Sequence, residues 1–242
     1  MSRSNNTELV NPAVRFFDYA GGTGAVQYYD RETKENVEVK LPFKFLILDR
    51  VAQVGGGIDR NGSYEGFWSN AVRNTKTQLF TVRSKAGVEC QGLYEAIKGY
   101  PGVKWITGLY IAFYDDDGAL AIGYLKIKGS ALNAWIEFSK SHKNIYEGAF
   151  GITGSTKAKK GTNTYYEPVF EHFPKVSAES DDRAKELDQD LQEYLTAYFA
   201  NVGQSTPEPE YSGGNGYHEP EMAPTNYDAE PPEYINDSEV PF

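Results

Sequence analysis

The sequence has a single cysteine, Cys90, and only three histidines, His142, His172 and His218. An intramolecular disulfide is therefore excluded, and clustered Cys/His zinc ligands are not expected, so we expect no metal ion and no cofactor. The chain also lacks any apolar run near the roughly 18 residues that a membrane-spanning helix needs, and no hydrophobic segment follows its first residues. We therefore expect a cytoplasmic protein without membrane contact.

Basic residues are missing from the last part of the chain. Residues 202–242 hold no Lys or Arg and 9 Asp/Glu, and residues 177–201 hold 2 and 7, whereas residues 1–176 hold 22 and 18. The formal net charge of -10 thus combines a mildly basic part, at +4, with an acidic end, at −14. Such segregation is typical of proteins that contact nucleic acid and carry an interaction tail.

The acidic end also has almost no aliphatic residues. Residues 204–236 are rich in Pro, Gly, Glu, Ser and Asn, so they cannot bury enough apolar surface to offset an ordering entropy of about 1–2 kcal/mol per residue. We predict a flexible N-terminus at residues 1–12, a β-rich nucleic-acid-binding domain at residues 13–176, an amphipathic helix at residues 177–201, and a disordered acidic tail at residues 202–242.

The β-rich region contains short runs of β-branched and aromatic residues between Gly, Asn and Asp turns, which predicts a mainly β fold. The clearest feature is a hairpin, in which residues 103–114 and 119–128 flank a turn at residues 115–118. Short strands with one intervening helix favour an OB-fold-like barrel. Gly55, Gly56 and Gly57 lack the following Lys-Ser/Thr of a phosphate loop, and we expect them to form a flexible connection between strands.

Two helices are expected. Residues 130–142 have apolar positions spaced as on one helical face, and residues 179–200 have a longer apolar stripe. The stripe consists of Ala184, Leu187, Leu191, Tyr194 and Tyr198, with Leu195 and Phe199 beside it. This face could pack against the β domain or form the seam of a homodimer, and the sequence leaves both possibilities open.

The end of the tail places acids before a branched aliphatic residue, a proline and a phenylalanine. The residues concerned are Asp237, Glu239, Val240, Pro241 and Phe242. A Phe ring can fill an apolar pocket, carboxylates add steering charge, and proline restricts the backbone, so this segment has the chemistry of a small peptide ligand.

That order resembles the acidic C-terminal tip of bacterial single-stranded DNA-binding proteins and of the phage proteins that share their design. With only two acids in the tip and a large β domain, the chain is more similar to the phage type. The resemblance implies that the β domain protects single-stranded DNA during replication, recombination and repair. It also implies that the five tip residues bind replication or recombination proteins, in the cytoplasm of a bacterial host if the chain is phage-encoded.

Binding of single strands without strong sequence preference requires aromatic rings that stack on bases, at about 1–3 kcal/mol per base, beside cations that contact phosphates. Three stretches offer this combination. The candidate contacts are Trp68, Arg73, Lys76, Arg83 and Lys85 in the first, Trp105, Tyr110, Tyr124, Lys126 and Lys128 in the hairpin, and Lys157, Lys159, Lys160 and Tyr165 in the third.

Strand alternation predicts how some of these side chains point. In a strand at residues 79–85, Arg83 and Lys85 would face solvent and Phe80 the core. In the hairpin, Tyr124 would share a solvent-facing side with Lys126 and Lys128, and the basic run at residues 157–161 is expected to form a flexible loop.

Two other functions remain open. Clustered carboxylates at residues 115–117 could hold Mg²⁺ in a nuclease, although the following Gly118 favours a hairpin turn. Alternatively, the chain is an adaptor that binds no DNA and presents peptide motifs on its tail. No nucleophile motif is recognisable, and we expect no enzymatic activity.

Overall fold

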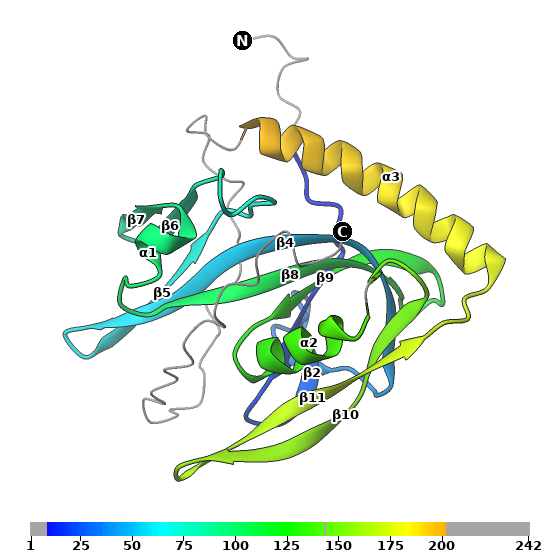
Figure 1. Ribbon diagram of the computed structural model, residues 1–242, viewed down its shortest axis with the longest axis horizontal. Helices are drawn as coiled ribbons and strands as arrows, with labels where there is room; N and C mark the ends of the chain where they lie inside the picture. Colours follow the sequence, from blue (N-terminus) through cyan, green and yellow to red (C-terminus); the bar gives the residue numbers. More distant parts are fainter. Residues whose placement is uncertain (1–8, 143, 202–242) are drawn as a thin grey trace.

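The computed structural model describes residues 9–142 and 144–201. Most of the predicted flexible N-terminus and the whole predicted tail, including the tip at residues 237–242, lie outside the described residues. Within the described part, the fold is mainly β, as the sequence predicts, with eleven strands and three helices (Figure 1).

The strands form one extended sheet with a side branch. Their bounds are β1 Arg15–Ala20, β2 Ala25–Tyr29, β3 Asn36–Glu38, β4 Phe43–Arg60, β5 Ser63–Ser69, β6 Phe80–Ser84, β7 Gly87–Gly92, β8 Val103–Tyr114, β9 Leu120–Ile127, β10 Ala149–Lys160 and β11 Asn163–Phe173. The helices are α1 Tyr94–Ile97, α2 Ser130–Lys140 and α3 Ala178–Asn201. The strand order is β3-β2-β1-β9-β8-β4-β5-β6-β7, and β10 pairs with β4 and with β11.

The sheet is open and mixed. β1 and β9 are parallel, whereas β4, β8 and β9 follow one another in antiparallel pairs. Among the described strands the path of pairing does not return to its start, so a closed OB-fold-like barrel is not confirmed. Tyr166 of β11 nevertheless donates its backbone N–H to the carbonyl of Gly21, in the β1–β2 turn, at 2.8 Å.

The predicted hairpin is confirmed as β8 and β9. Asp115 closes the turn, since its Oδ1 accepts hydrogen bonds from the backbone N–H groups of Asp117 and Ala119, and Gly118 adopts a positive φ of 77°. Asp116 forms an ion pair with Arg15. The carboxylate of Asp115 is therefore held by the turn, and that of Asp116 by a cation from β1.

The expectation for the three glycines is wrong, because they lie inside the 18-residue strand β4. Gly56 has a φ of 149°, and a Cβ at this position would lie 2.0 Å from the carbonyl oxygen of Gly102. The glycines thus allow close backbone packing within the sheet, where the sequence alone indicated only a break in the pattern.

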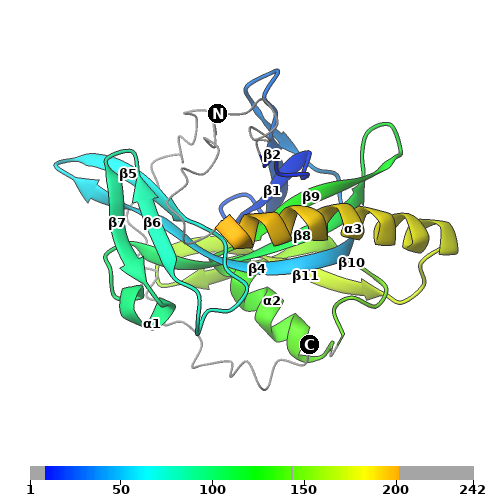
Figure 2. The ribbon, with the colours of Figure 1, turned by 90° about the horizontal axis from the view of Figure 1, so that it is seen from above.

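Three apolar clusters stabilise the domain. The largest contains Phe17 and Phe150 and is covered by α2, a second lies between the sheet and α3, and a third fills the lobe of β5, β6, β7 and α1. Helices α2 and α3 lie on opposite sides of the sheet (Figure 2). α3 buries Leu187, Leu191 and Leu195 against it, so the chain's own sheet covers the face that could have formed a dimer seam.

Candidate nucleic-acid interface

One face of the sheet is divided between α3 and solvent. Along β8, alternation puts Gly108, Tyr110 and Ala112 on the face that α3 covers, and Tyr110 and Ala112 pack in the same cluster as α3. Lys104 and Ile106 belong to the same face but lie nearer the start of the strand. There Lys104 is exposed and Ile106 is partly exposed, so the sheet beyond α3 is open to solvent.

An aromatic ring and two cations meet on this open part. The Cα register pairs Lys104 of β8 with Gly55 of β4, Gly55 with Trp68 of β5, and Trp68 with Arg83 of β6. Residues paired in this way share a face, and strands are about 4.8 Å apart, so the four residues form a row about 14 Å long. We call these four residues the Trp68 row.

Three of the four members of the row contribute exposed side chains to an accessible surface. Trp68 is 43% exposed, and Lys104 and Arg83 are also exposed. Between Lys104 and Trp68, Gly55 has no side chain, and a Cβ there would lie 2.8 Å from Cδ1 of Ile106. Gly55 itself is buried, because the side chain of Ile106 lies over it on this face.

The local sequence fixes the direction of the indole. On either side of Trp68, Phe67 and Ser69 point to the opposite face and are 3% and 1% exposed. Ser69 Oγ accepts a hydrogen bond from the backbone N–H of Val54 at 2.9 Å, which anchors β5 to β4. Because both neighbours of Trp68 are buried, the pleat directs its side chain to solvent.

A second ring on this face was not identified from the sequence. Tyr64 is 67% exposed and lies two positions before Gly66 and four before Trp68, on the same face of β5. Its ring covers Gly57, since a Cβ there would lie 2.3 Å from the Tyr64 Cζ atom. Lys104 was also missed, and the alternating pattern of β5 and β8 was the signal that could have revealed both residues.

Two of the predicted lysines extend the same face onto β9. Lys126 is paired with Gly108 in the register, and Lys128 follows it two residues later. Asp18 of β1 lies between them, with its Oδ2 2.9 Å from Lys128 Nζ, and burial lowers the pKa of Lys126 while Asp18 raises it. The carboxylate is 8% exposed and partly neutralises the lysines. This end of the face is therefore less basic than the sequence predicted.

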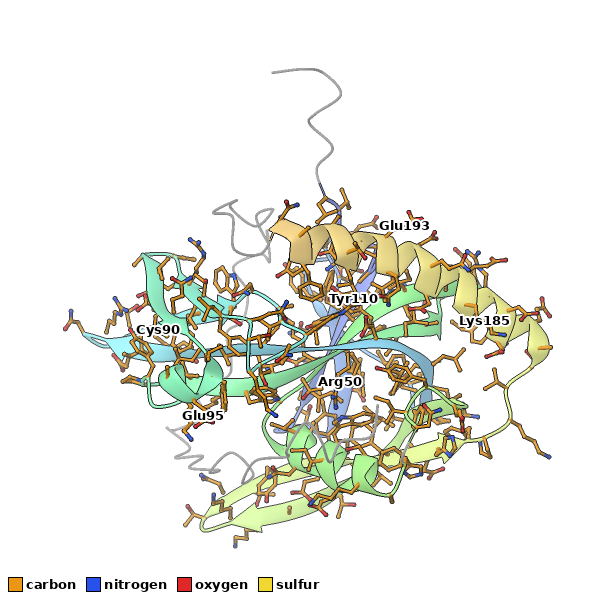
Figure 3. The ribbon with its side chains drawn as sticks, turned by 45° about the horizontal axis from the view of Figure 1, so that its top comes forward. Arg50, Cys90, Glu95, Tyr110, Lys185 and Glu193 are labelled. Atoms are coloured by element: carbon orange, nitrogen blue, oxygen red, sulfur yellow. The ribbon has the colours of Figure 1, made fainter. Side chains whose placement is uncertain are left out.

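Tyr110 and Tyr124 do not reach the open surface. Each is 4% exposed beneath α3, and their rings pack edge to face with centroids 4.9 Å apart. The hydroxyl of Tyr124 donates to Oε1 of Gln53, and Figure 3 shows Tyr110 between α3 and the sheet. The expectation of a solvent-facing Tyr124 is therefore wrong, because α3 covers this part of the face.

Arg73 and Trp105 also have structural partners. Arg73 forms an ion pair with Asp49 and a hydrogen bond with Gln192 Oε1, and its guanidinium lies 5.1 Å from the centroid of Phe199, so it holds the end of α3. Trp105 points to the core side of the sheet and donates its indole N–H to Thr107 Oγ1 at 3.1 Å. Neither side chain joins the Trp68 row.

The other predicted cations are exposed. Lys76 precedes β6 and Lys85 follows it, while Phe80 within that strand is buried as predicted. The third stretch is not a loop, because Lys157, Lys159 and Lys160 belong to β10 and only the two residues between Lys160 and β11 form the turn.

The β10–β11 hairpin therefore presents its lysines on two faces. In the register, Lys157 faces Tyr166, and Ala158 faces Tyr165. Alternation puts Lys157 and Lys159 on one side of the hairpin and Lys160 with Tyr165 on the other. In Figure 1 this hairpin extends away from α3 as an arm of the molecule. It is a second exposed basic surface.

The chain matches no family model, no curated protein and no solved structure. Within residues 9–142 and 144–201, no helix is long and apolar enough to cross a membrane. The same residues contain no group of three or more His, Cys, Asp or Glu side chains that could hold a metal ion. The assignment of a function therefore depends on the geometry of the exposed surface.

Proposed function

We propose that this protein binds single-stranded DNA without strong sequence preference and protects it during replication and recombination. The Trp68 row is the observation that carries the proposal. It presents an exposed indole between Lys104 and Arg83, on the same face as the partly exposed Ile106. Aromatic faces interleaved with cations are the combination that sequence-tolerant binding of single strands requires.

In this proposal the indole stacks on an unpaired base. Lys104 and Arg83 contact the phosphates on either side, and Tyr64 offers a second ring along the same strand. Every base has a flat face, so stacking does not depend on sequence, and it contributes about 1–3 kcal/mol per base. Paired bases inside a duplex are already stacked on their neighbours, so the same surface favours single strands.

The order and pairing of the strands support a relation between this sheet and the OB-fold. The strands β4, β8, β9, β10 and β11 occur in this order in the chain, with β5, β6, β7 and α1 inserted after the first and α2 between the third and the fourth. Their pairs are β4–β8, β8–β9, β4–β10 and β10–β11. OB-folds bind oligonucleotides on the face of their second and third strands and in the loops that follow strands 1 and 4. The corresponding parts here are the portion of the β8–β9 face that α3 does not cover, the β5–β7 lobe and the β10–β11 arm.

The charge and the tip of the tail also support the proposal. Residues 1–176 carry a net charge of +4 and the remainder −14, so the domain can attract phosphates while the tail repels them. We assign Asp237, Glu239, Val240, Pro241 and Phe242 to the recruitment of replication or recombination proteins, as the resemblance of the tip implies. A nuclease or an adaptor without DNA binding are the alternatives that the experiment below distinguishes.

The direct test is quenching of tryptophan fluorescence by oligo-dT across a salt series, with duplex DNA and oligo-rU as competitors. Trp68 is exposed, Trp105 points to the core side of the sheet and Trp135 is 3% exposed, so quenching should come mainly from Trp68. The logarithm of affinity should fall linearly with the logarithm of salt concentration, with a slope of about −0.7 per phosphate contact. Absence of quenching and of salt dependence would refute the proposal, and Mg²⁺-dependent cutting would favour the nuclease.

A further inference from the structure

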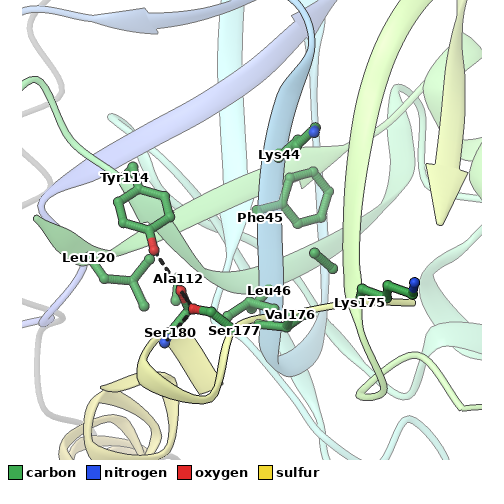
Figure 4. Close-up of a pocket in the computed structure, with 11 residues that line it drawn as sticks. Lys44, Phe45, Leu46, Ala112, Tyr114, Leu120, Lys175, Val176, Ser177 and Ser180 are labelled. Atoms are coloured by element: carbon green, nitrogen blue, oxygen red, sulfur yellow. Dashed lines mark hydrogen bonds between the residues drawn. The ribbon is translucent and has the colours of Figure 1, made fainter. Parts of the chain in front are cut away.

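A cavity of about 220 Å³ opens at the other end of the α3-covered face (Figure 4). Ala112 and Tyr114 of β8 line it, eight and ten residues along the strand from Lys104, and Ser177 and Ser180 at the start of α3 form its rim. The cavity is therefore separate from the Trp68 row. The proposed contacts with single-stranded DNA do not involve this cavity.

The interior of the cavity is apolar. Leu46, Leu120, Ala149 and Val176 contribute most of this character, and they come from four different segments of the chain. An apolar cavity of about 150 Å³ is large enough to bind benzene. A single phenyl ring therefore fits in this space, whereas a drug-sized ligand would need about 300 Å³ or more.

The rim favours a ligand with negative charge. Lys44 and Lys175 both line the cavity and are exposed, and Lys44 Nζ lies 4.4 Å from the centroid of the Phe173 ring. The first turn of α3, whose backbone N–H groups form the positive end of the helix, also faces the rim. Glu179 and Asp181 belong to that turn, but neither lines the cavity.

The hydroxyl groups at the rim are already ordered. Tyr114 OH and Ser180 Oγ are 2.6 Å apart, and Ser177 Oγ lies 2.7 Å from the same serine and accepts its backbone N–H (Figure 4). This chain of hydrogen bonds ties β8 to the beginning of α3. The cavity is thus a preformed site, and its binding chemistry is a phenyl-sized apolar space beside two cations.

A segment of this chain has the matching chemistry. Residues 237–242 combine two carboxylates, Asp237 and Glu239, with Val240, Pro241 and Phe242. The tail begins at the opposite end of α3 from the cavity, and the 24 residues of that helix span about 36 Å. The 35 residues that separate the helix from the segment are rich in Pro and Glu, and such a chain is more extended than a Gly/Ser-rich chain of equal length, whose root-mean-square length is about 30–35 Å.

The 35 residues are therefore long enough to span the helix, which permits docking within one molecule. The effective concentration of a tethered ligand is highest when the root-mean-square length of the tether matches the distance to be spanned, and it reaches about the millimolar range. Even a weak peptide ligand would therefore occupy the cavity for a substantial fraction of the time.

We propose that residues 237–242 dock in the cavity at the start of α3 of the same chain. The ring of Phe242 occupies the apolar space, and Asp237 and Glu239 lie close to Lys44 and Lys175. A docked segment cannot bind another protein at the same time. The cavity therefore sets how much of the tail tip is accessible to partners, and this competition does not require DNA.

The test compares backbone amide resonances of the full-length chain and its Phe242→Ala variant by NMR, without DNA. Resonances of Ala149, Val176 and Ser180 should move in the variant, because the ring leaves the cavity. Tyr234→Ala, which removes an aromatic residue of the same tail outside the segment, should leave them unchanged. Adding a synthetic peptide of residues 237–242 to the Phe242→Ala chain should restore the original positions.

Charge and concentration provide two further checks. Lys175→Glu should reproduce the shifts of Phe242→Ala, whereas Lys157→Glu, an exposed lysine on the β10–β11 arm, should not. The spectrum should not change on tenfold dilution. Shifts that depend on concentration would show that a second copy fills the cavity, and would overturn docking within one chain.

The proposal is also overturned if Phe242→Ala moves no resonance at the cavity, or if it moves those of Trp68 and Arg83 instead. The second result would place the segment on the proposed DNA-binding surface. Because no nucleic acid is present, failure here leaves the binding of single-stranded DNA intact, and loss of DNA binding in the fluorescence titration would leave the cavity assignment intact.

Discussion

The packing of α3 leads to a quantitative prediction for Leu191→Ala. Leu191 is fully buried between α3 and the sheet, in the cluster that contains Tyr110 and Tyr124. The substitution removes three carbon atoms, which corresponds to about 2.4 kcal/mol of transfer free energy at roughly 0.8 kcal/mol per group. A rigid sheet and two large rings limit the collapse of the cavity, so the total loss should lie between about 3 and 5 kcal/mol.

Urea denaturation followed by circular dichroism measures this change in the free energy of unfolding. The matched control is Gln189→Ala, an exposed position on the same helix, which should change stability by less than about 0.5 kcal/mol. The midpoint should be independent of protein concentration, since α3 packs on its own chain. A loss below about 1 kcal/mol for Leu191→Ala, or a midpoint that rises with concentration, would refute this packing.

Three other predictions concern pH and the tail. Burial raises the pKa of Tyr19 to about 12. The stability that depends on its neutral hydroxyl should therefore be present below pH 10 and lost as the pH rises toward 12. Absorbance at 295 nm measures this titration, and a Tyr19 pKa near 10 in the folded protein would contradict the prediction. Removal of residues 204–242, which carry 9 acids, should strengthen oligo-dT binding at low salt, and unchanged affinity in anisotropy titrations would exclude electrostatic competition by the tail. Deletion of Phe242 alone should leave DNA affinity unchanged and abolish partner pull-down, and retention of the partners would refute the recruiting role of the tip.

Local patterns in the sequence predicted much of the fold. The β8–β9 hairpin follows from alternation and an Asp-Gly turn, and α3 follows from an apolar stripe with helical spacing. Phe80 is buried and Arg83 exposed, as the pleat of a single strand requires. In each case the interacting residues belong to one helix, one strand or two strands joined by a short turn, so the local sequence contains the necessary information.

The predictions that are wrong concern features that depend on contacts between distant segments. Alternation shows that Tyr124 and Leu125 point to opposite faces, but α3, more than fifty residues later, determines which face is covered. The closure of the sheet and the position of the three glycines within β4 depend on strand pairing across the whole domain.

The candidate site also depends on contacts between distant segments, so local sequence patterns could not predict it in full. Trp68, Lys104 and Arg83 come from three separate strands, and β4 lies between two of them, so only the register places the three side chains in one row. The sequence could identify Trp68 and Arg83 as candidates because they occur in one aromatic and basic stretch. It could not connect them with Lys104.

The central claim is that Trp68 stacks on DNA between two cations, and oligo-dT affinity of Trp68 variants measured by anisotropy tests it most directly. Trp68→Ala should weaken binding by about 5- to 150-fold, while Trp68→Phe, which keeps an aromatic face, should retain most of the affinity. Lys104→Ala and Arg83→Ala should each reduce the slope of log affinity against log salt concentration by about 0.7, and Lys98→Ala, directly after α1 in the same lobe, should not. Unchanged affinity in Trp68→Ala would contradict the account.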